Sequence, residues 1–134
     1  MKFRALQVLC ILGLAAAWIA CGSGHPTIRS ITVTPTTSTA PISPPTDVQY
    51  TATATFSDNT SRELNVSDGL SWSTSDNTIA TISDNGSATC HALGQVTITA
   101  QAPSELNITV NNGVNNTSPK VTGTAQLTCQ APPV

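Results

Sequence analysis

The sequence LSWSTSDNTIATISDNGSATCHALGQVTITA, residues 70–100, decides the fold. It consists of short runs rich in Thr, Ile and Val, separated by turns built from Asp, Asn and Gly. β-Branched residues favour strands, and Asp, Asn and Gly favour the tight turns between strands. Because these turn signals recur at short intervals, the stretch predicts a small β-sandwich. Trp72 is the tryptophan of this stretch and is expected to anchor the core.

The clearest strand outside this stretch spans residues 48–56, where apolar and polar residues alternate strictly. Such alternation is typical of a strand with one buried face and one solvated face. Four threonine or glutamine residues form its polar face. The apolar set, which is expected to face the core, is Val48, Tyr50, Ala52, Ala54 and Phe56.

The flanking sequence extends the same pattern. Residues 28–34 alternate and end at Pro35, and residues 121–129 alternate again near the C-terminus. The prolines at 41, 44 and 45 make the stretch between these runs an edge strand or a loop, because proline cannot donate to a central ladder. No helix is expected after the N-terminal leader. The sequence therefore predicts an all-β, immunoglobulin-like β-sandwich of about seven short strands after a cleaved N-terminal signal.

The tripeptide Ser-Asp-Asn occurs at 57–59, 75–77 and 83–85, each time between strand-like runs. Two interpretations are open, a turn held by local hydrogen bonds and a calcium site at one end of the sandwich. Calcium needs about 6–8 oxygen ligands, several of them from clustered carboxylates. Each tripeptide brings a single acid, so the pattern favours turns and no metal is expected.

The first residues have the three parts of a secretory signal. Lys2 and Arg4 form a positive region, residues 5–17 form an apolar core, and Ile19-Ala20-Cys21 resembles a bacterial lipobox. In such lipoproteins the cysteine is acylated and becomes the N-terminus. Trp18 departs from the pattern, in which leucine is usual, so plain secretion and an uncleaved anchor remain alternatives.

The expected organisation follows from that cleavage. Residues 1–20 are the lipoprotein signal peptide, 21–28 the lipidated tether, 29–130 the Ig-like domain and 131–134 a tail. The expected location is the bacterial envelope, at the outer membrane or cell surface rather than the cytoplasmic membrane. The membrane itself is then a partner through the lipid on Cys21.

The remaining cysteines form a pair. Cys10 leaves with the leader and Cys21 carries lipid, so Cys90 and Cys129 are left. Both lie in the inward phase of their strands, and an even remainder in an exported protein is typical of a disulfide. The alternative is two buried free thiols that act as small hydrophobic side chains.

Composition narrows the function. Charged residues make up 9% of the chain, and loss of the two leader cations takes the formal net charge from −2 to −4. No basic stripe exists, so nucleic acid is excluded as a partner. His25 lies in the tether and His91 in an outward phase, and the acids are scattered singly over turns. We therefore expect no catalytic residues, no cofactor and no enzyme activity.

Four segments together resemble the bacterial immunoglobulin-like domain of group 2, known from invasin- and intimin-like surface proteins. They are ITVTP at 31–35, WSTSD at 72–76, IATIS at 79–83 and GQVTITA at 94–100. The resemblance implies an Ig-like fold and a surface or envelope setting, and it implies no reaction. Cys90 stands where that family commonly has a small residue, and residues 103–119, which contain Asn112-Gly113, are interpreted as an inserted hairpin or loop.

Two functions remain open. One is a structural or accessory lipoprotein, which would assist an envelope assembly through pairing at a strand edge. The other is a surface recognition or adhesion module that binds a protein or a glycan. Because Trp72, Tyr50 and Phe56 are assigned to the core, no aromatic platform for a sugar is expected from the sequence.

Overall fold

The structure is a computed structural model that describes residues 24–106 and 116–134. The expected signal peptide and Cys21 lie outside these residues. Within them the fold is all-β, as predicted, with ten strands and one short 3-10 helix. The strands are β1 (Ile28–Thr34), β2 (Thr37–Pro41), β3 (Val48–Gln49), β4 (Thr51–Phe56), β5 (Ser61–Glu63), β6 (Ser71–Thr74), β7 (Ala80–Ile82), β8 (Ser87–Cys90), β9 (Gly94–Pro103) and β10 (Lys120–Gln130).

The strands form two layers. One layer is a four-stranded sheet in the order β2-β10-β9-β6. Its longest pair is β9 with β10, antiparallel from Lys120 opposite Pro103 to Cys129 opposite Gly94. The other layer combines β1-β4-β5 with β3-β8-β7, since β3 and β4 are one run interrupted only at Tyr50. Counting β3 and β4 as one run accounts for one of the three strands beyond the expected seven, and the short β2 and β5 account for the other two.

The chain changes layers between β1 and β2. β1 pairs antiparallel with β4, whereas β2 pairs in parallel with β10 at the edge of the other sheet. Pro35 lies at the change, as its missing N–H predicts. At the β2 edge the main chain continues into the proline-rich loop, so the prolines stay outside the central ladders.

The alternating residues fill the space between the layers, as the period-two pattern predicts. All of β4's apolar residues are buried, and so are the inward residues of β9 and β10. Tyr50 is the largest fully buried side chain, with 1% of its surface exposed. No polar or charged residue is buried among the described residues apart from that phenol's hydroxyl.

β1 and β10 approach each other closely although they belong to different sheets. A Cβ on Gly123 of β10 would collide with the backbone carbonyl of Ile31 in β1. The φ of Gly123 lies outside the left-handed region, so backbone conformation does not require glycine there. Glycine is needed because there is no space for a Cβ. This contact closes one side of the sandwich.

One short element was not expected. A 3-10 turn, η1 (Val66–Asp68), lies between β5 and β6. The Asn65 side chain accepts from the backbone N–H of Ser67, and the Asp68 carboxylate accepts from the backbone N–H of Asn65. Asn-Val-Ser-Asp is therefore a capping box, and this local signal overrides the strand pattern around it.

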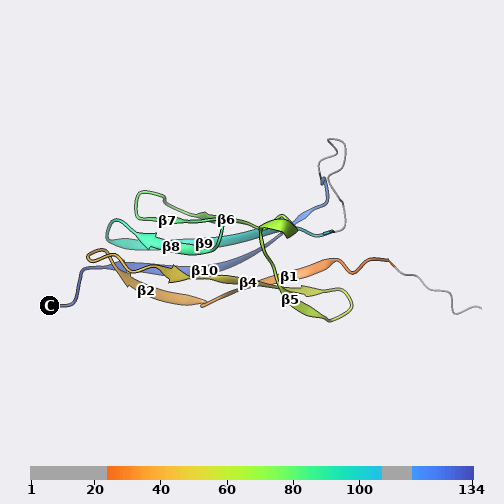
Figure 1. Cartoon of the computed structure of the whole chain (residues 1–134), viewed down its shortest axis with the longest axis horizontal. Coiled ribbons are helices and arrows are strands. Elements are labelled where there is room, and N and C mark those ends of the chain that lie inside the picture. The colour runs from red at the N-terminus through yellow and green to blue at the C-terminus, as the bar shows by residue number, and fades with distance from the viewer. Residues whose placement is uncertain (1–23, 107–115) are drawn as a thin grey trace, which may run out of the picture.

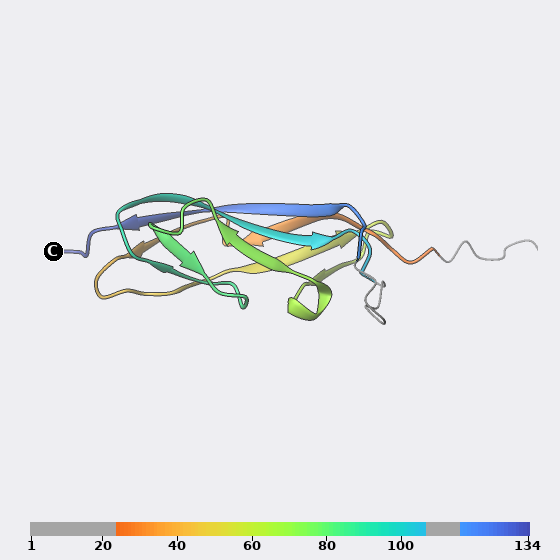
Figure 2. The ribbon, with the colours of Figure 1, turned by 90° about the horizontal axis from the view of Figure 1, so that it is seen from above.

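The molecule is elongated, with the C-terminus at one end and the start of β1 at the other (Figures 1 and 2). The start of β1 lies beside the end of β9, because the Ile28 N–H donates to the Ser104 carbonyl at 2.8 Å. The connection between β9 and β10, part of the segment expected to be inserted, therefore leaves from the same end as the tether. Residues 107–115 of that segment lie outside the described residues. None of the described residues forms a helix suited to crossing a membrane.

Candidate binding cleft and the cysteine cross-link

The cysteine pair joins the two layers. Cys90 in β8 and Cys129 in β10 form a disulfide with 5.6 Å between their Cα atoms. Both residues are almost completely buried, with 1% and 3% of their surface exposed. A cross-link between strands 39 residues apart in the sequence ties the sheets near the C-terminal end of the sandwich.

Two Ser-Asp-Asn segments are turns held by their own side chains. The Asp58 carboxylate accepts from the backbone N–H and the hydroxyl of Thr60, at 2.9 and 2.6 Å. Asp76 accepts from the same two groups of Thr78 at the same distances. These hydrogen bonds lower the pKa of both carboxyls. The carboxylates therefore act locally, as the turn interpretation predicts.

Trp72 lies at the edge of the core rather than in its centre. It is partly buried and packs against the buried cluster, whose largest member is Tyr50. Tyr50 is the largest fully buried side chain, and the role of Trp72 as core anchor stays a prediction. Alternation assigned Trp72 to the inward face correctly, but an inward side chain at a sheet edge can still meet solvent.

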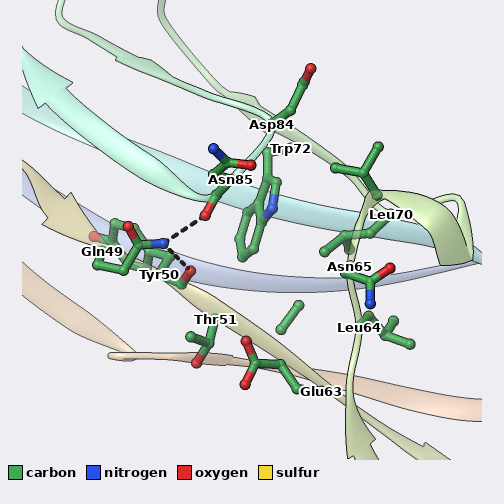
Figure 3. A pocket seen from close by; sticks show the side chains of 12 residues that line it. Gln49, Tyr50, Thr51, Glu63, Leu64, Asn65, Leu70, Trp72, Asp84 and Asn85 are labelled. Carbon is green, nitrogen blue, oxygen red and sulfur yellow. Dashed lines mark hydrogen bonds between the residues drawn. The ribbon is translucent and has the colours of Figure 1, made fainter.

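The indole ring lines a cleft of about 160 Å³ between β4 and β5 of one layer and β6 of the other (Figure 3). In Figure 3 the ring stands between Asn85 and Leu70, while the Asp84 carboxylate points away from it. The lining residues are Gln49, Tyr50, Thr51, Ala52, Glu63, Leu64, Asn65, Val66, Leu70, Trp72, Asp84 and Asn85.

The cleft exists because the run formed by β3 and β4 changes partners. It pairs with β8 at Val48–Gln49 and with β5 at residues 53–55. Between these two ladders the run makes one backbone hydrogen bond to each neighbouring segment. The Tyr50 N–H donates to the Gly86 carbonyl, and the Ala52 carbonyl accepts from the Leu64 N–H. The opening between the two partner strands is where Trp72 reaches the surface.

Gly86 shapes the floor of this opening. Its φ of +79° lies in the left-handed region, and a Cβ there would meet the Tyr50 carbonyl and lie 3.2 Å from the Trp72 ring. The Gln49 amide holds the same turn by donating to the Asn85 carbonyl at 2.6 Å and to the Tyr50 carbonyl at 3.1 Å. The main chain of the turn that carries Asn85 is thus held by Gly86 and the Gln49 side chain.

Several polar groups of the cleft have no hydrogen-bond partner among the residues that the structure describes. Among the described residues, neither the Glu63 carboxylate nor the Asn85 side-chain amide makes a hydrogen bond. The Asn65 side-chain oxygen caps η1, which leaves its NH₂ group available. Hydrogen-bonding groups beside a partly exposed aromatic ring are typical of a ligand site.

The cleft is negative. Glu63 and Asp84 belong to its lining, and no lysine or arginine does. The nearest cation on β5, Arg62, is held in a two-pronged pair with Asp68, at 2.7 and 2.9 Å, and its guanidinium lies 5.7 Å from the Phe56 ring centre. The hydrogen bond from Arg62 lowers the pKa of Asp68. The cleft therefore favours neutral or cationic ligands.

The structure brings to Trp72 residues that the sequence did not place beside it. Glu63, Asn65 and Asn85 come from three separate turns or strand ends, and only the fold brings them to Trp72. His91 is exposed and bonds the Thr81 hydroxyl at 2.8 Å through its Nε2. The described residues hold no group of three or more His, Cys, Asp or Glu placed to bind a metal.

A model of the bacterial Ig-like domain family, group 2, matches residues 27–125. This range covers β1 to the middle of β10, including every residue of the cleft. A comparison with curated proteins found no match.

Proposed function

This chain belongs to the bacterial Ig-like domain family of group 2, and from that membership we propose that it is a non-enzymatic module of the bacterial envelope, anchored by lipid on Cys21. Domains of this family serve as structural or adhesion-type modules. The leader and the Ile19-Ala20-Cys21 sequence support the anchor. The structural or accessory role is the first of the two functions proposed.

The shape of the domain carries this proposal. β1 begins at one end of the long axis and the C-terminus lies at the other (Figure 1). Six residues separate Cys21 from Ile28, so a lipid on Cys21 holds the domain close to the membrane with its long axis free to project. The disulfide-linked end is then the end farther from the anchor. A short, cross-linked, projecting module suits a spacer or scaffold in a larger assembly.

The anchor is tested by Cys21→Ser. We expect the variant to lose lipid labelling and to leave the membrane fraction, because the acylated group is the cysteine thiol. Fractionation of cells that express the full chain, with metabolic labelling by a fatty acid, measures both effects. Cys10→Ser is the matched control and should behave as the wild type. A Cys21→Ser chain that stays labelled contradicts the lipoprotein assignment.

A specific observation also favours recognition as the second function. Trp72, assigned to the core from sequence, is partly exposed in a cleft with polar groups that have no partner among the described residues. Such a surface suits a ligand, whereas a purely structural spacer has no need of it. The two functions differ in where the domain lies.

Lys120 distinguishes the two locations. It is exposed, and after cleavage it is the only lysine, while a fully acylated Cys21 has no free amine. Intact cells treated with a membrane-impermeant amine reagent should label Lys120 as strongly as lysed cells if the domain faces outward, which supports recognition. Labelling only after lysis places the domain in the periplasm and supports the accessory role. Lys120→Arg should abolish the signal in both samples.

A further inference from the structure

The Trp72 cleft has the parts that a sugar ring requires. The C–H bonds on one face of a pyranose carry partial positive charge, and they stack on the negative face of an aromatic ring. In Figure 3 the indole stands in the opening with Asn85 on one side and Leu70 on the other. The Asn85 side chain lies beside the ring in Figure 3, and the Glu63 carboxylate belongs to the same lining.

The size of the cleft limits the ligand. Sites for drug-sized molecules have volumes of roughly 300–1,000 Å³, whereas this cleft has about 160 Å³. It therefore accepts one ring of a longer chain rather than a whole oligosaccharide. Two further observations bear on the choice of ligand. Glu63 and Asp84 disfavour acidic sugars and phosphates, and the backbone groups of Tyr50 and Ala52 that face the opening are already bonded to Gly86 and Leu64.

The cleft lining contains both apolar and polar groups, which an acetamido substituent requires. Leu64, Val66 and Leu70 are its apolar members, and Val66 is 53% exposed. The Glu63 carboxylate comes from the adjoining strand end and accepts no hydrogen bond from the described residues. An acetamido group carries a methyl for the apolar side and an N–H for the carboxylate.

We propose that the Trp72 cleft binds one N-acetylhexosamine unit of a neutral glycan. This deepens the recognition function proposed above and rests on it. Trp72 stacks on the sugar ring, Glu63 accepts the acetamido N–H, and the Asn85 amide bonds a ring hydroxyl. Gln49 and Gly86 are positioning residues, because they hold the turn that carries Asn85.

The chain provides its own reporter. Its two tryptophans are Trp18 and Trp72, so the full chain with Trp18→Leu emits from the cleft alone. We expect titration with tri-N-acetylchitotriose to shift this emission to shorter wavelength and to saturate. Cellotriose, the same β-linked trimer without acetamido groups, should bind at least tenfold more weakly, since a hydrogen bond to a charged group is worth about 1.5–3 kcal/mol.

Two variants make the test specific. Glu63→Gln should weaken binding of the acetylated trimer by about tenfold, and its melting temperature should match the parent because Glu63 is exposed. Glu105→Gln removes an exposed carboxylate outside the cleft and should leave binding unchanged.

The outcomes distinguish a failure of the N-acetylhexosamine assignment from a failure of the recognition function on which it rests. No saturable shift with the acetylated trimer, or equal binding of cellotriose, overturns the N-acetylhexosamine assignment whatever the location of the domain. If Lys120 is labelled only in lysed cells, recognition at the cell surface is contradicted. The fluorescence titration still decides whether the cleft binds this sugar. A saturable shift whose affinity Glu63→Gln lowers about tenfold, while Glu105→Gln leaves it unchanged, supports the proposal.

Discussion

Replacing Cys90 and Cys129 together by alanine is expected to lower the free energy of unfolding by about 4 kcal/mol. The disulfide closes a loop whose ends are 39 residues apart in sequence. A closed loop of about 40 residues restricts the unfolded chain, and that restriction is lost in the variant. Alanine keeps the sites apolar, so the change reports mainly the cross-link. A loss this large is a substantial part of the total stability of a small domain, which is about 5–15 kcal/mol.

Denaturant unfolding of the wild type and the double variant measures the difference. The wild type with its disulfide reduced should unfold together with the double variant, and Cys90→Ala alone should lose nearly as much. Oxidised and reduced wild type with the same midpoint would show that the bond does not stabilise the fold. Disulfides form outside the cytoplasm, so protein that is retained in the cytoplasm should show the same loss of stability as the double variant.

The sequence was sufficient for the fold because period-two alternation fixes which side chains face the core. Residues 48–56 show this, since every apolar position turns inward in the structure. The same phase argument brought Cys90 and Cys129 to the inward face. The capping box at Asn65 was missed because strand patterning on either side hid a local signal that the sequence does contain.

The cleft could not be predicted in the same way. Phase states that Trp72 points inward, but it does not state whether neighbouring strands cover it. Exposure of Trp72 depends on where β5 and β8 stop pairing with the β3–β4 run, and that is a property of the whole sheet. Glu63 and Asn85 are 22 residues apart in sequence, so their proximity also follows only from the fold.

Tyr50→Ala is expected to destabilise the domain by about 3–5 kcal/mol, the usual cost of removing a large buried aromatic side chain. Tyr50 is 1% exposed and crosses the sandwich from one layer to the other. Its hydroxyl contacts the Ser38 hydroxyl in β2 and lies 3.4 Å from the Gln126 carbonyl in β10. The residue therefore fills the core and also ties β2 to the opposite layer. Thermal and denaturant unfolding measure the loss.

Two companion variants separate these contributions. Tyr50→Phe keeps the ring and removes the hydroxyl, so it should cost about 1 kcal/mol. Trp72→Ala should cost less than Tyr50→Ala, because the indole is only partly buried. If Trp72→Ala proves the more destabilising of the two, the indole is the core anchor after all and the cleft is a packing feature.

The pH dependence gives an independent check on the same side chain. Burial raises the pKa of the Tyr50 phenol above its value in the unfolded chain, against a smaller opposing effect of the Ser38 hydrogen bond. A raised pKa means that the folded state holds the proton more tightly. This contribution to stability is therefore fully present below the pKa of the unfolded state, about 10, and falls as the pH rises through the pKa of the folded state.

The measurement is direct because Tyr50 is the only tyrosine, so phenolate absorbance follows its ionisation. Tyr50→Phe should lack this loss of stability at alkaline pH. A tyrosine that ionises near pH 10 in the folded protein would place it in solvent and contradict its position at the centre of the core.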